Sequence, residues 1–255
     1  MKVNNSATVY IKWLAIWDSL SVFFDGPIDI TMYEDMLDWS LTKYGFAEQF
    51  EHGLDWVTTG IAHWLVVVIT FDRLAATYFP IEYQSHYSNP RFSYKILAGL
   101  FIFVYVIIGF PTMLVYHNCV NGTCNLRPAF ADKPIILMLV TLQGYIPVIF
   151  TVIGNSMICL KISLGNTKKM KNGGVEKLLF IVSISFLIFV TLAETCYYIQ
   201  YYNKLNGKNC NMFTAVINSI TKTSLVTNSG INFFLYILLG KTFRQKFLQL
   251  IKFRQ

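Results

Sequence analysis

Residues 94–116 have the sequence YKILAGLFIFVYVIIGFPTMLVY, which contains no charged side chain after Lys95. A helix needs about 20 mostly apolar residues to cross the hydrocarbon core of a bilayer. Because that core offers no water to the backbone, a single crossing segment must be helical. We therefore expect a membrane-spanning helix over 94–116.

Five further stretches have a similar length and composition, and the six together predict an all-α membrane protein with one domain over residues 1–255. The other expected spans are 7–24, 54–79, 134–162, 176–202 and 212–239. A shorter segment follows at 241–253, where Phe243, Phe247, Leu248 and Ile251 recur with Lys and Arg between them. That pattern is typical of an amphipathic helix on a membrane surface.

The composition agrees with a membrane protein and excludes two other classes. Hydrophobic residues make up 54% of the chain, and charged residues only 14%. Soluble domains carry about 25% charged residues, and disordered chains need low hydrophobicity. The net charge of +7 is no sign of nucleic-acid binding, because no basic stripe interleaves with aromatic residues.

The distribution of Lys and Arg predicts the orientation. Most of the 21 cationic residues lie on one side of the six spans if the N-terminus is cytoplasmic. Cytoplasmic loops of membrane proteins carry such an excess. We therefore expect a multi-pass plasma-membrane protein with both chain ends in the cytoplasm.

The loops on the outer side contain three further signals. Asn121-Gly122-Thr123 is a glycosylation sequon, and Cys119 and Cys124 flank it in a compartment that permits disulfides. The stretch 25–53 is rich in Asp and Glu. A solvated loop is its simpler interpretation, and attraction of a cationic ligand is the functional one.

Four motifs occur in order on successive spans. They are LAIWD at 14–18, FDRL at 71–74, Pro147 within the fourth span, and NSGINFFLY at 228–236. Together they resemble the second-helix LAxxD, third-helix D/E-R-Y, fifth-helix Pro and seventh-helix NPxxY motifs of rhodopsin-like (class A) G protein-coupled receptors. By this resemblance the six spans are helices two to seven of a seven-helix receptor, and the first helix is absent.

The resemblance assigns a role to Asp72 and Arg73. In the family this pair holds the inactive state, and the arginine then receives the G protein. The alternative from the residues alone is a charge pair that anchors the helix at the membrane interface. Leu74 stands where the family has Tyr, an exchange that leaves the ion pair intact.

An acid within the first span predicts an interior polar network, because an intramembrane charge is costly unless it faces the bundle or water. We expect its members to be Asp18, Asn228, Ser229, Asn232 and Tyr236. The resemblance implies a sodium ion held by Asp18, Asn228, Ser229 and Asn232. Ala62 stands where the family's sodium site has a serine, which is a departure from that site. Phe233 replaces the family proline, which puts the inward movement of helix seven in doubt.

The candidate ligand pocket combines acids and aromatic residues near the outer ends of the spans: Asp55, Trp56, Glu194, Tyr197 and Tyr198. Asp55 matches the position at which amine receptors of the family bind ammonium. Val226 and a helix six without Trp depart from the amine pattern, so a peptide ligand is favoured. An aromatic belt at the interface and a Glu194–Lys222 pair are the structural alternatives.

The family's disulfide has no counterpart here, because its helix-three position falls at Glu48. Cys119 and Cys124 are left to pair with each other, or one of them with Cys210. No choice between these pairings follows from the sequence.

The leading hypothesis is a divergent receptor that binds an extracellular peptide or small cationic ligand, as neuropeptide receptors do, and couples to a heterotrimeric G protein. The second is a truncated, non-signalling chain that is unstable or modulates a full-length receptor. A transporter would need an internal repeat, which is lacking. An enzyme is not expected, since the four His residues show no catalytic spacing, and we expect no cofactor.

Overall fold

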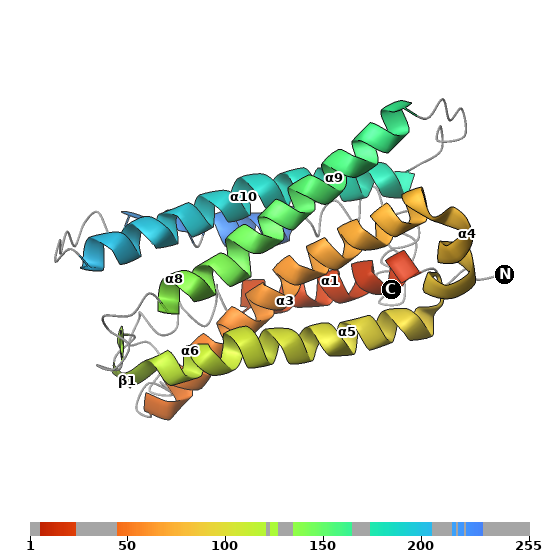
Figure 1. The fold of residues 1–255 in the computed structure, drawn as a ribbon. Helices are drawn as coiled ribbons and strands as arrows, with labels where there is room; N and C mark the ends of the chain where they lie inside the picture. The colour runs from red at the N-terminus through yellow and green to blue at the C-terminus, as the bar shows by residue number, and fades with distance from the viewer. Residues whose placement is uncertain are drawn as a thin grey trace, which may run out of the picture.

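The computed structural model describes residues 6–23, 45–120, 123–126, 135–164, 174–205, 216–217, 219–221 and 223–231. Most of them form long helices that lie side by side in an elongated bundle (Figure 1). The first helices are α1 (Ser6–Phe23) and α3 (Gly45–Tyr78). A short turn of α4 (Pro80–Glu82) and η3 (Tyr83–Tyr87) leads from α3 to the next long helix.

The next two long helices contain π-helical turns. The first of them after α3 runs through α5 (Pro90–Val104), η4 (Tyr105–Gly109) and α6 (Phe110–Val115). The next consists of α8 (Ile135–Val140), η5 (Thr141–Tyr145) and α9 (Ile146–Leu164). Helix α10 covers Gly174–Leu205, and the chain is helical again at 216–217, 219–221 and 223–231.

These helices coincide with five of the six expected spans, and the sixth is described only in part. By length and composition, three helical stretches can cross a membrane: Trp56–Tyr78, Pro90–Thr112 and Leu137–Lys161. Ser183–Cys196 is a shorter apolar stretch within α10. A count of six spans therefore stays a prediction, and the expected amphipathic helix at 241–253 lies outside the described residues.

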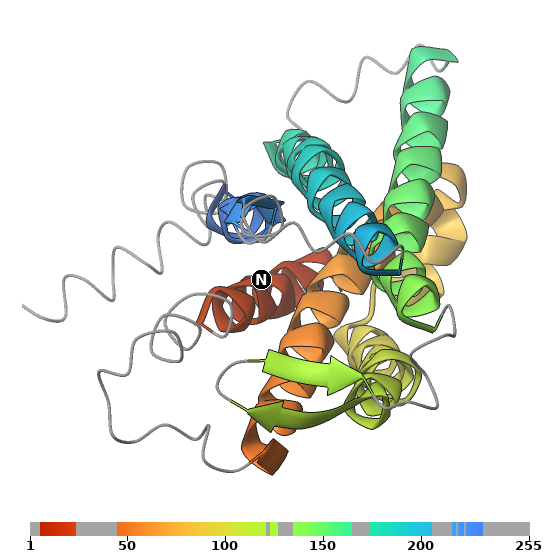
Figure 2. The ribbon, with the colours of Figure 1, turned by 90° about the vertical axis from the view of Figure 1, so that its left-hand side faces the viewer.

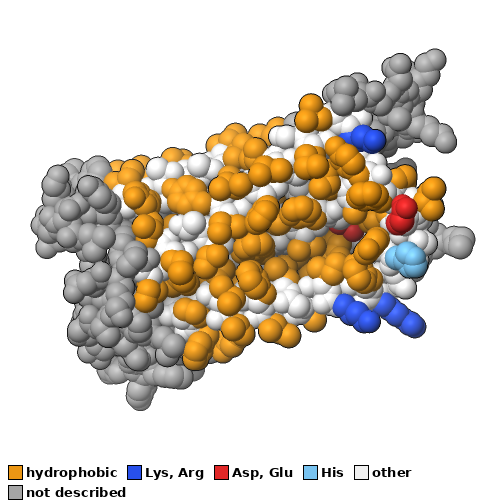
Figure 3. Space-filling view, in the orientation of Figure 1, with side chains coloured by type: hydrophobic (Ala, Val, Ile, Leu, Met, Phe, Trp, Pro, Cys, Tyr) orange, Lys and Arg blue, Asp and Glu red, His pale blue; other side chains and the backbone are white. Residues whose placement is uncertain are grey.

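The outer surface of the bundle is apolar along most of its length (Figure 3). Ile102, Leu160 and Ile188 are 66%, 60% and 57% exposed, on three different helices. Contiguous apolar surface of this extent is unusual for a soluble monomer. It is what a protein embedded in lipid requires.

Helix α3 forms the centre of the fold. The end-on view places it between α1, the α5–α6 helix and α9 (Figure 2). Its Leu65 is fully buried, as are Val104 and Leu139 of the neighbouring helices. Two glycines bring these neighbours close: a methyl group added at Gly109 would overlap Val57, and one at Gly154 would overlap Thr70.

Two polar side chains of α3 contact the π-helical turn η5. A π-turn shifts the backbone bonding from i−4 to i−5 and leaves carbonyl groups without their usual helical partner. His63 Nδ1 lies 3.0 Å from the carbonyl oxygen of Gln143, and Trp64 Nε1 donates to that of Leu142 at 3.1 Å. Polar side chains of α3 thus satisfy the carbonyls of η5.

A feature that the all-α expectation did not include is an antiparallel hairpin of β1 (Tyr116–Val120) and β2 (Thr123–Leu126). The residues between the strands are Asn121 and Gly122. Asn-Gly is the strongest short sequence signal for a two-residue hairpin turn. The same Asn and Gly also belong to the glycosylation sequon, and the hairpin is an addition to the expected helical fold.

Candidate functional site

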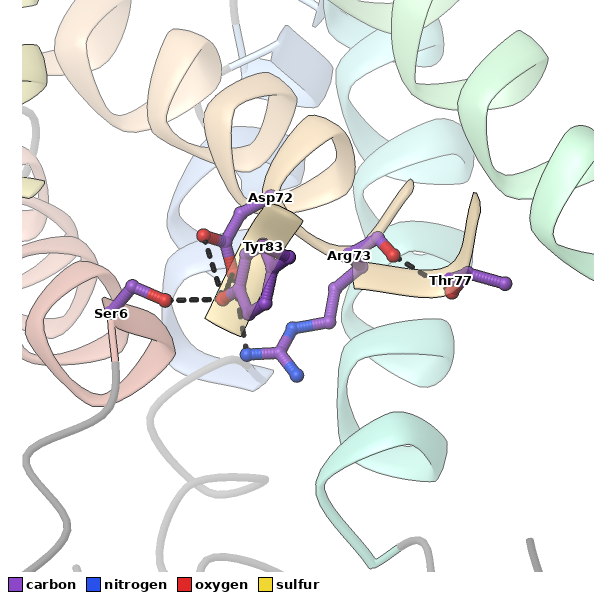
Figure 4. A network of polar contacts seen from close by, with 5 residues as sticks. All are labelled: Ser6, Asp72, Arg73, Thr77 and Tyr83. Atoms are coloured by element: carbon purple, nitrogen blue, oxygen red, sulfur yellow. Dashed lines mark hydrogen bonds and ion pairs between the residues drawn. The ribbon is translucent and has the colours of Figure 1, made fainter. Parts of the chain in front are cut away.

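The first candidate site lies at the C-terminal end of α3, at the end of the bundle where α4 is found (Figures 1 and 4). Arg73 Nη2 lies 3.4 Å from Oδ2 of Asp72, and the two side chains are 19% and 8% exposed. The ion pair expected from the sequence therefore exists. The 3.4 Å separation is longer than the roughly 2.7–2.9 Å of a charge-assisted hydrogen bond, so this pair alone does not hold Arg73 firmly.

Asp72 has a second and closer partner in Tyr83. After α3 ends, Pro80 begins α4, and the following turn brings Tyr83 back over the end of α3, where it is 6% exposed. Its hydroxyl group donates to Oδ2 of Asp72 at 2.9 Å and lies 3.1 Å from Oδ1. The carboxylate is thus held by the segment that follows its own helix.

Ser6 of α1 completes the network through a hydrogen bond with the Tyr83 hydroxyl group (Figure 4). A carboxylate can only accept, and a tyrosine has one hydroxyl hydrogen. Tyr83 therefore donates to Asp72, and its oxygen accepts from Ser6. Burial is the main cause that raises the pKa of Tyr83, with the nearby Asp72 charge adding to it and the Ser6 hydrogen bond opposing it. The phenol therefore remains a donor at neutral pH.

Arg73 has unused capacity for hydrogen bonding. Among the described residues, its Nε atom is buried without a hydrogen-bond partner, and Nη2 has the ion pair with Asp72 but no hydrogen bond. Its backbone carbonyl accepts from Thr77 at 2.8 Å, which concerns the helix and not the guanidinium group. The arrangement leaves a positively charged side chain at the end of the bundle with donors available to a further partner.

Tyr83 and Ser6 were not identified from the sequence. Tyr83 occurs in a polar connection, YQSHYS at 83–88, with no pattern that marks it as buried. Only the reversal of the chain after Pro80 brings it to Asp72. Ser6 precedes the apolar run of α1 and looks like an ordinary helix start.

The second candidate site is the polar seam between α1 and the last described helical residues. Asp18 is 3% exposed and accepts from Ser229 Oγ at 3.4 Å. Asn228 is also buried, but its Oδ1 accepts from Ser185 of α10 at 3.3 Å. The structure thus brings Asp18 and Ser229 together as expected, and connects Asn228 to a residue that was not foreseen.

A sodium ion at this seam stays a prediction. Asp18, Ser229 and Asn228 supply the oxygen atoms that hard cations prefer. In the described part of the chain no three His, Cys, Asp or Glu residues form a cluster that could hold a metal ion. Asn232 and Tyr236, the other expected members of the network, lie outside the described residues.

The residues of the expected ligand pocket occupy different environments. Trp56 is 8% exposed and Glu194 5%, whereas Tyr198 is 42% exposed on the surface of α10. The position of Tyr198 suits the alternative of an interfacial aromatic residue. Asp55 and Tyr197 belong to α3 and α10, but their side chains are not among those described.

The candidate disulfide and glycosylation sites fall mostly where the structure gives no side chains. Cys119 is in β1 and Cys124 in β2, whose backbones pair in register at His117↔Asn125 and Val120↔Thr123. Between these pairs β1 has two residues and β2 has one, Cys124, which makes a bulge. Asn121 and Cys210 lie outside the described residues, so the pairing and the glycosylation stay predictions.

Comparison with known protein families identifies a receptor family. The family described as "7 transmembrane receptor (rhodopsin family)" matches residues 1–236. The match extends over nearly the whole chain and includes all four motif regions, from LAIWD at 14–18 to the final Tyr236.

Proposed function

Because this chain belongs to the rhodopsin family of seven-transmembrane receptors, we propose that it binds an extracellular peptide and couples to a cytoplasmic heterotrimeric G protein through Arg73. The observation that carries the proposal is the state of Arg73. It is paired loosely with Asp72 at 3.4 Å, and part of its guanidinium group makes no hydrogen bond among the described residues.

The network around Asp72 supports a switch with two states. In the state described, Asp72 is engaged by Tyr83 and Arg73 together. If Arg73 moved to a partner protein, the Asp72 carboxylate would still accept a hydrogen bond from Tyr83. A partner that binds the exchanged state more tightly would then shift the population toward it.

The surface around Arg73 suits the docking of a protein. Ile81 is 79% exposed and Phe79 is 61% exposed, both in the connection that follows α3. Apolar side chains exposed beyond the end of the helices are typical anchors of protein interfaces. They support a docking surface built from the α3–α5 connection and Arg73.

The charge distribution supports a cytoplasmic position for this end. On the face drawn in Figure 3, the described Lys and Arg side chains gather at the end where α4 lies. Exposed cations there include Arg91, Lys95 and Lys161. The excess of Lys and Arg in cytoplasmic loops favours a plasma-membrane receptor with this end inside the cell and the hairpin outside.

For the ligand, a peptide remains the first choice and an amine the second. The acid-rich stretch 25–53 would attract a cationic peptide from the outer side. Asp55 would supply the counter-charge for an amine. The choice between them rests on sequence alone.

The experiment that tests the proposal measures nucleotide exchange on purified heterotrimeric G proteins by the full chain in lipid nanodiscs. We expect basal exchange above that of empty nanodiscs, and a loss of about tenfold or more in Arg73→Ala, equivalent to about 1.4 kcal/mol. Arg73→Lys should recover only part, since it lacks the planar fork. Gly99→Ala, at an exposed position with nothing within 4 Å, is the control and should match the wild type.

Exchange no higher than in empty nanodiscs would contradict coupling. The non-signalling alternative would then take its place, and co-expression with a full-length receptor would show whether the chain lowers that receptor's surface level. Equal exchange by wild type and Arg73→Ala would contradict the assigned role of Arg73.

A further inference from the structure

Glu194 is an acid in the interior of the bundle that the coupling site does not use. It is 5% exposed and lies within the apolar stretch Ser183–Cys196 of α10. No hydrogen bond or ion pair joins its carboxyl group to another residue in the part of the chain that the structure describes. Such a group is unusual, because acids within membrane spans nearly always have a partner and a function.

The carboxyl group of Glu194 is held in one place by close packing. It lies against Gly144 of η5, where an added methyl group would overlap the carboxyl carbon and the side chain before it. Beside this contact, the hydroxyl group of Tyr145 donates to Thr195 Oγ1 at 3.4 Å and joins η5 to α10. A glycine in a π-turn therefore leaves the space that the acid occupies, and π-turns are frequent at functional sites.

Two other buried polar atoms on the same two elements also have no hydrogen-bond partner among the described residues: Oε1 of Gln143 on η5 and Oγ1 of Thr191 on α10. Gln143 is 7% exposed and directly precedes Gly144. Thr191 precedes Glu194 by one helical turn and is on the same face of α10. Buried polar atoms are nearly always satisfied, so an acid without a partner, with further open polar atoms on the two elements that meet there, points to a missing partner.

The chemistry of the open atoms defines that partner. A cation beside Glu194 would keep its carboxyl group ionised, because an anion in an apolar interior needs a positive charge. An ionised carboxylate and an amide oxygen only accept hydrogen bonds, so such a partner must also donate. An ammonium group has three N–H donors and a guanidinium group has five, so both meet the two requirements.

We propose that Glu194 is the counter-charge for a ligand's ammonium or guanidinium group, bound at the junction of η5 and α10. The inference rests on the proposed function, since it names the chemical class of ligand for a receptor of this family. It places the ligand's positive charge beside Glu194 and not beside Asp55. A metal ion is the weaker occupant, because only one carboxylate is available and no cluster of three His, Cys, Asp or Glu exists among the described residues.

The test uses the full chain in lipid nanodiscs and measures its thermal unfolding with small probes. Benzylammonium and benzylguanidinium represent a small free amine or guanidine, and acetyl-lysine amide and acetyl-arginine amide represent the same groups within a peptide. Benzyl alcohol is the neutral control, and sodium and calcium chloride are the metal controls. A ligand that binds only the folded state raises the unfolding temperature, and we expect a rise of about 2 °C or more with at least one organic cation.

Glu194→Gln removes the charge and keeps the shape of the side chain. We expect it to abolish the rise with organic cations and to leave the unliganded unfolding temperature equal to the wild type or higher, because an unpaired buried acid destabilises. A merely structural acid would show the opposite, a lower unfolding temperature. Glu82→Gln, at an exposed acid, is the matched control and should keep the rise.

Three outcomes would overturn the inference: no rise with any organic cation, an equal rise with benzyl alcohol or a metal chloride, or an undiminished rise in Glu194→Gln. Should Glu194→Gln fail to fold, Gly144→Ala is the second variant, because its methyl group displaces the carboxyl group; a full rise there would also overturn it. A larger rise with the benzyl cations would indicate a small amine or guanidine ligand. A larger rise with acetyl-lysine amide or acetyl-arginine amide would indicate a peptide. Loss of nucleotide exchange in Arg73→Ala together with an intact cation response would keep the two proposals apart.

Discussion

Tyr83 donates its phenolic hydrogen to the carboxylate of Asp72, with 2.9 Å to Oδ2 and 3.1 Å to Oδ1. The two residues are eleven positions apart, and the connection after α3 must reverse to bring them together. Through Ser6 the same hydroxyl group also joins α1. One phenol therefore ties three segments at the end of the bundle where Arg73 lies (Figure 4).

The first prediction concerns this hydroxyl group. Tyr83→Phe removes the donor to Asp72 and the acceptor for Ser6 and keeps the ring. Hydrogen bonds to charged groups contribute about 1.5–3 kcal/mol, so we expect the unfolding temperature to fall by a few degrees. Asp72 would then rely on Arg73, and basal nucleotide exchange should fall because Arg73 is less free to leave.

The control for this change is Tyr87→Phe. Tyr87 is 44% exposed, and its ring packs edge-on against Phe92 at 5.2 Å, a contact that phenylalanine keeps. The unfolding temperature should match the wild type there. A rise of basal exchange in Tyr83→Phe would mean that the phenol restrains Arg73. The proposal that Tyr83 helps to release Arg73 from Asp72 would then be wrong.

The second prediction uses the glycine at the contact of η4 with α3. Gly109→Ala should destabilise the protein by about 1–3 kcal/mol, because the new methyl group overlaps Val57 and helix backbones cannot move apart cheaply. Gly99→Ala is the matched control in α5, since nothing lies within 4 Å of the new atom. There alanine should be neutral or stabilise by up to about 1 kcal/mol.

A double variant separates overlap from other effects of the substitution. Val57→Ala removes the overlapping group, so Gly109→Ala with Val57→Ala should be less destabilised than the sum of the single variants. Additive losses in thermal unfolding would show that the packing of η4 on α3 is not the cause.

The spans were predictable because their chemistry is local. Residues 94–116 carry enough apolar side chains to cross a bilayer whatever the rest of the chain does, and the helix over 90–115 confirms this. The Asp72–Arg73 ion pair was equally predictable, since the two residues are adjacent in the sequence. The family match over residues 1–236 confirms the resemblance that the four motifs indicated.

Contacts between distant segments were not predictable in this way. No periodic pattern marks Tyr83 as the partner of Asp72, and none marks the turn at Thr141–Tyr145 as π-helical. His63 and Trp64 are polar residues in an apolar helix, which indicates that they have polar partners. The sequence does not identify those partners as the carbonyls of Gln143 and Leu142. The hairpin did have a sequence signal, the Asn121-Gly122 pair, but the same residues also form the glycosylation sequon.

The third prediction tests the approach of α9 to α3. Gly154→Ala places a methyl group onto Thr70 Cγ2 and should lower stability by about 1–3 kcal/mol. Thr70→Ser removes that methyl group and keeps the hydrogen bond from Oγ to the carbonyl oxygen of Val66, which is 2.9 Å long. The combination should therefore recover most of the loss in thermal unfolding. No recovery would indicate that α9 and α3 separate for another reason.

The last prediction separates the two contacts of His63. This residue is 3% exposed, its ring packs edge-on against Phe186 at 5.1 Å, and its Nδ1 lies 3.0 Å from the carbonyl oxygen of Gln143. A carbonyl oxygen only accepts, so the hydrogen must be on Nδ1. His63→Phe keeps the ring and leaves the carbonyl of the π-turn unpaired, whereas His63→Asn keeps a donor near the Nδ1 position and loses the ring.

In an apolar interior the unpaired carbonyl costs about 1–3 kcal/mol. If the hydrogen bond holds η5 in its π-helical form, His63→Phe should be the less stable variant and should speed amide hydrogen exchange across 141–145. His63→Asn should keep slow exchange there despite its lost ring packing. The reverse order would show that the contact with Phe186 matters more, and that η5 keeps its form without help from α3.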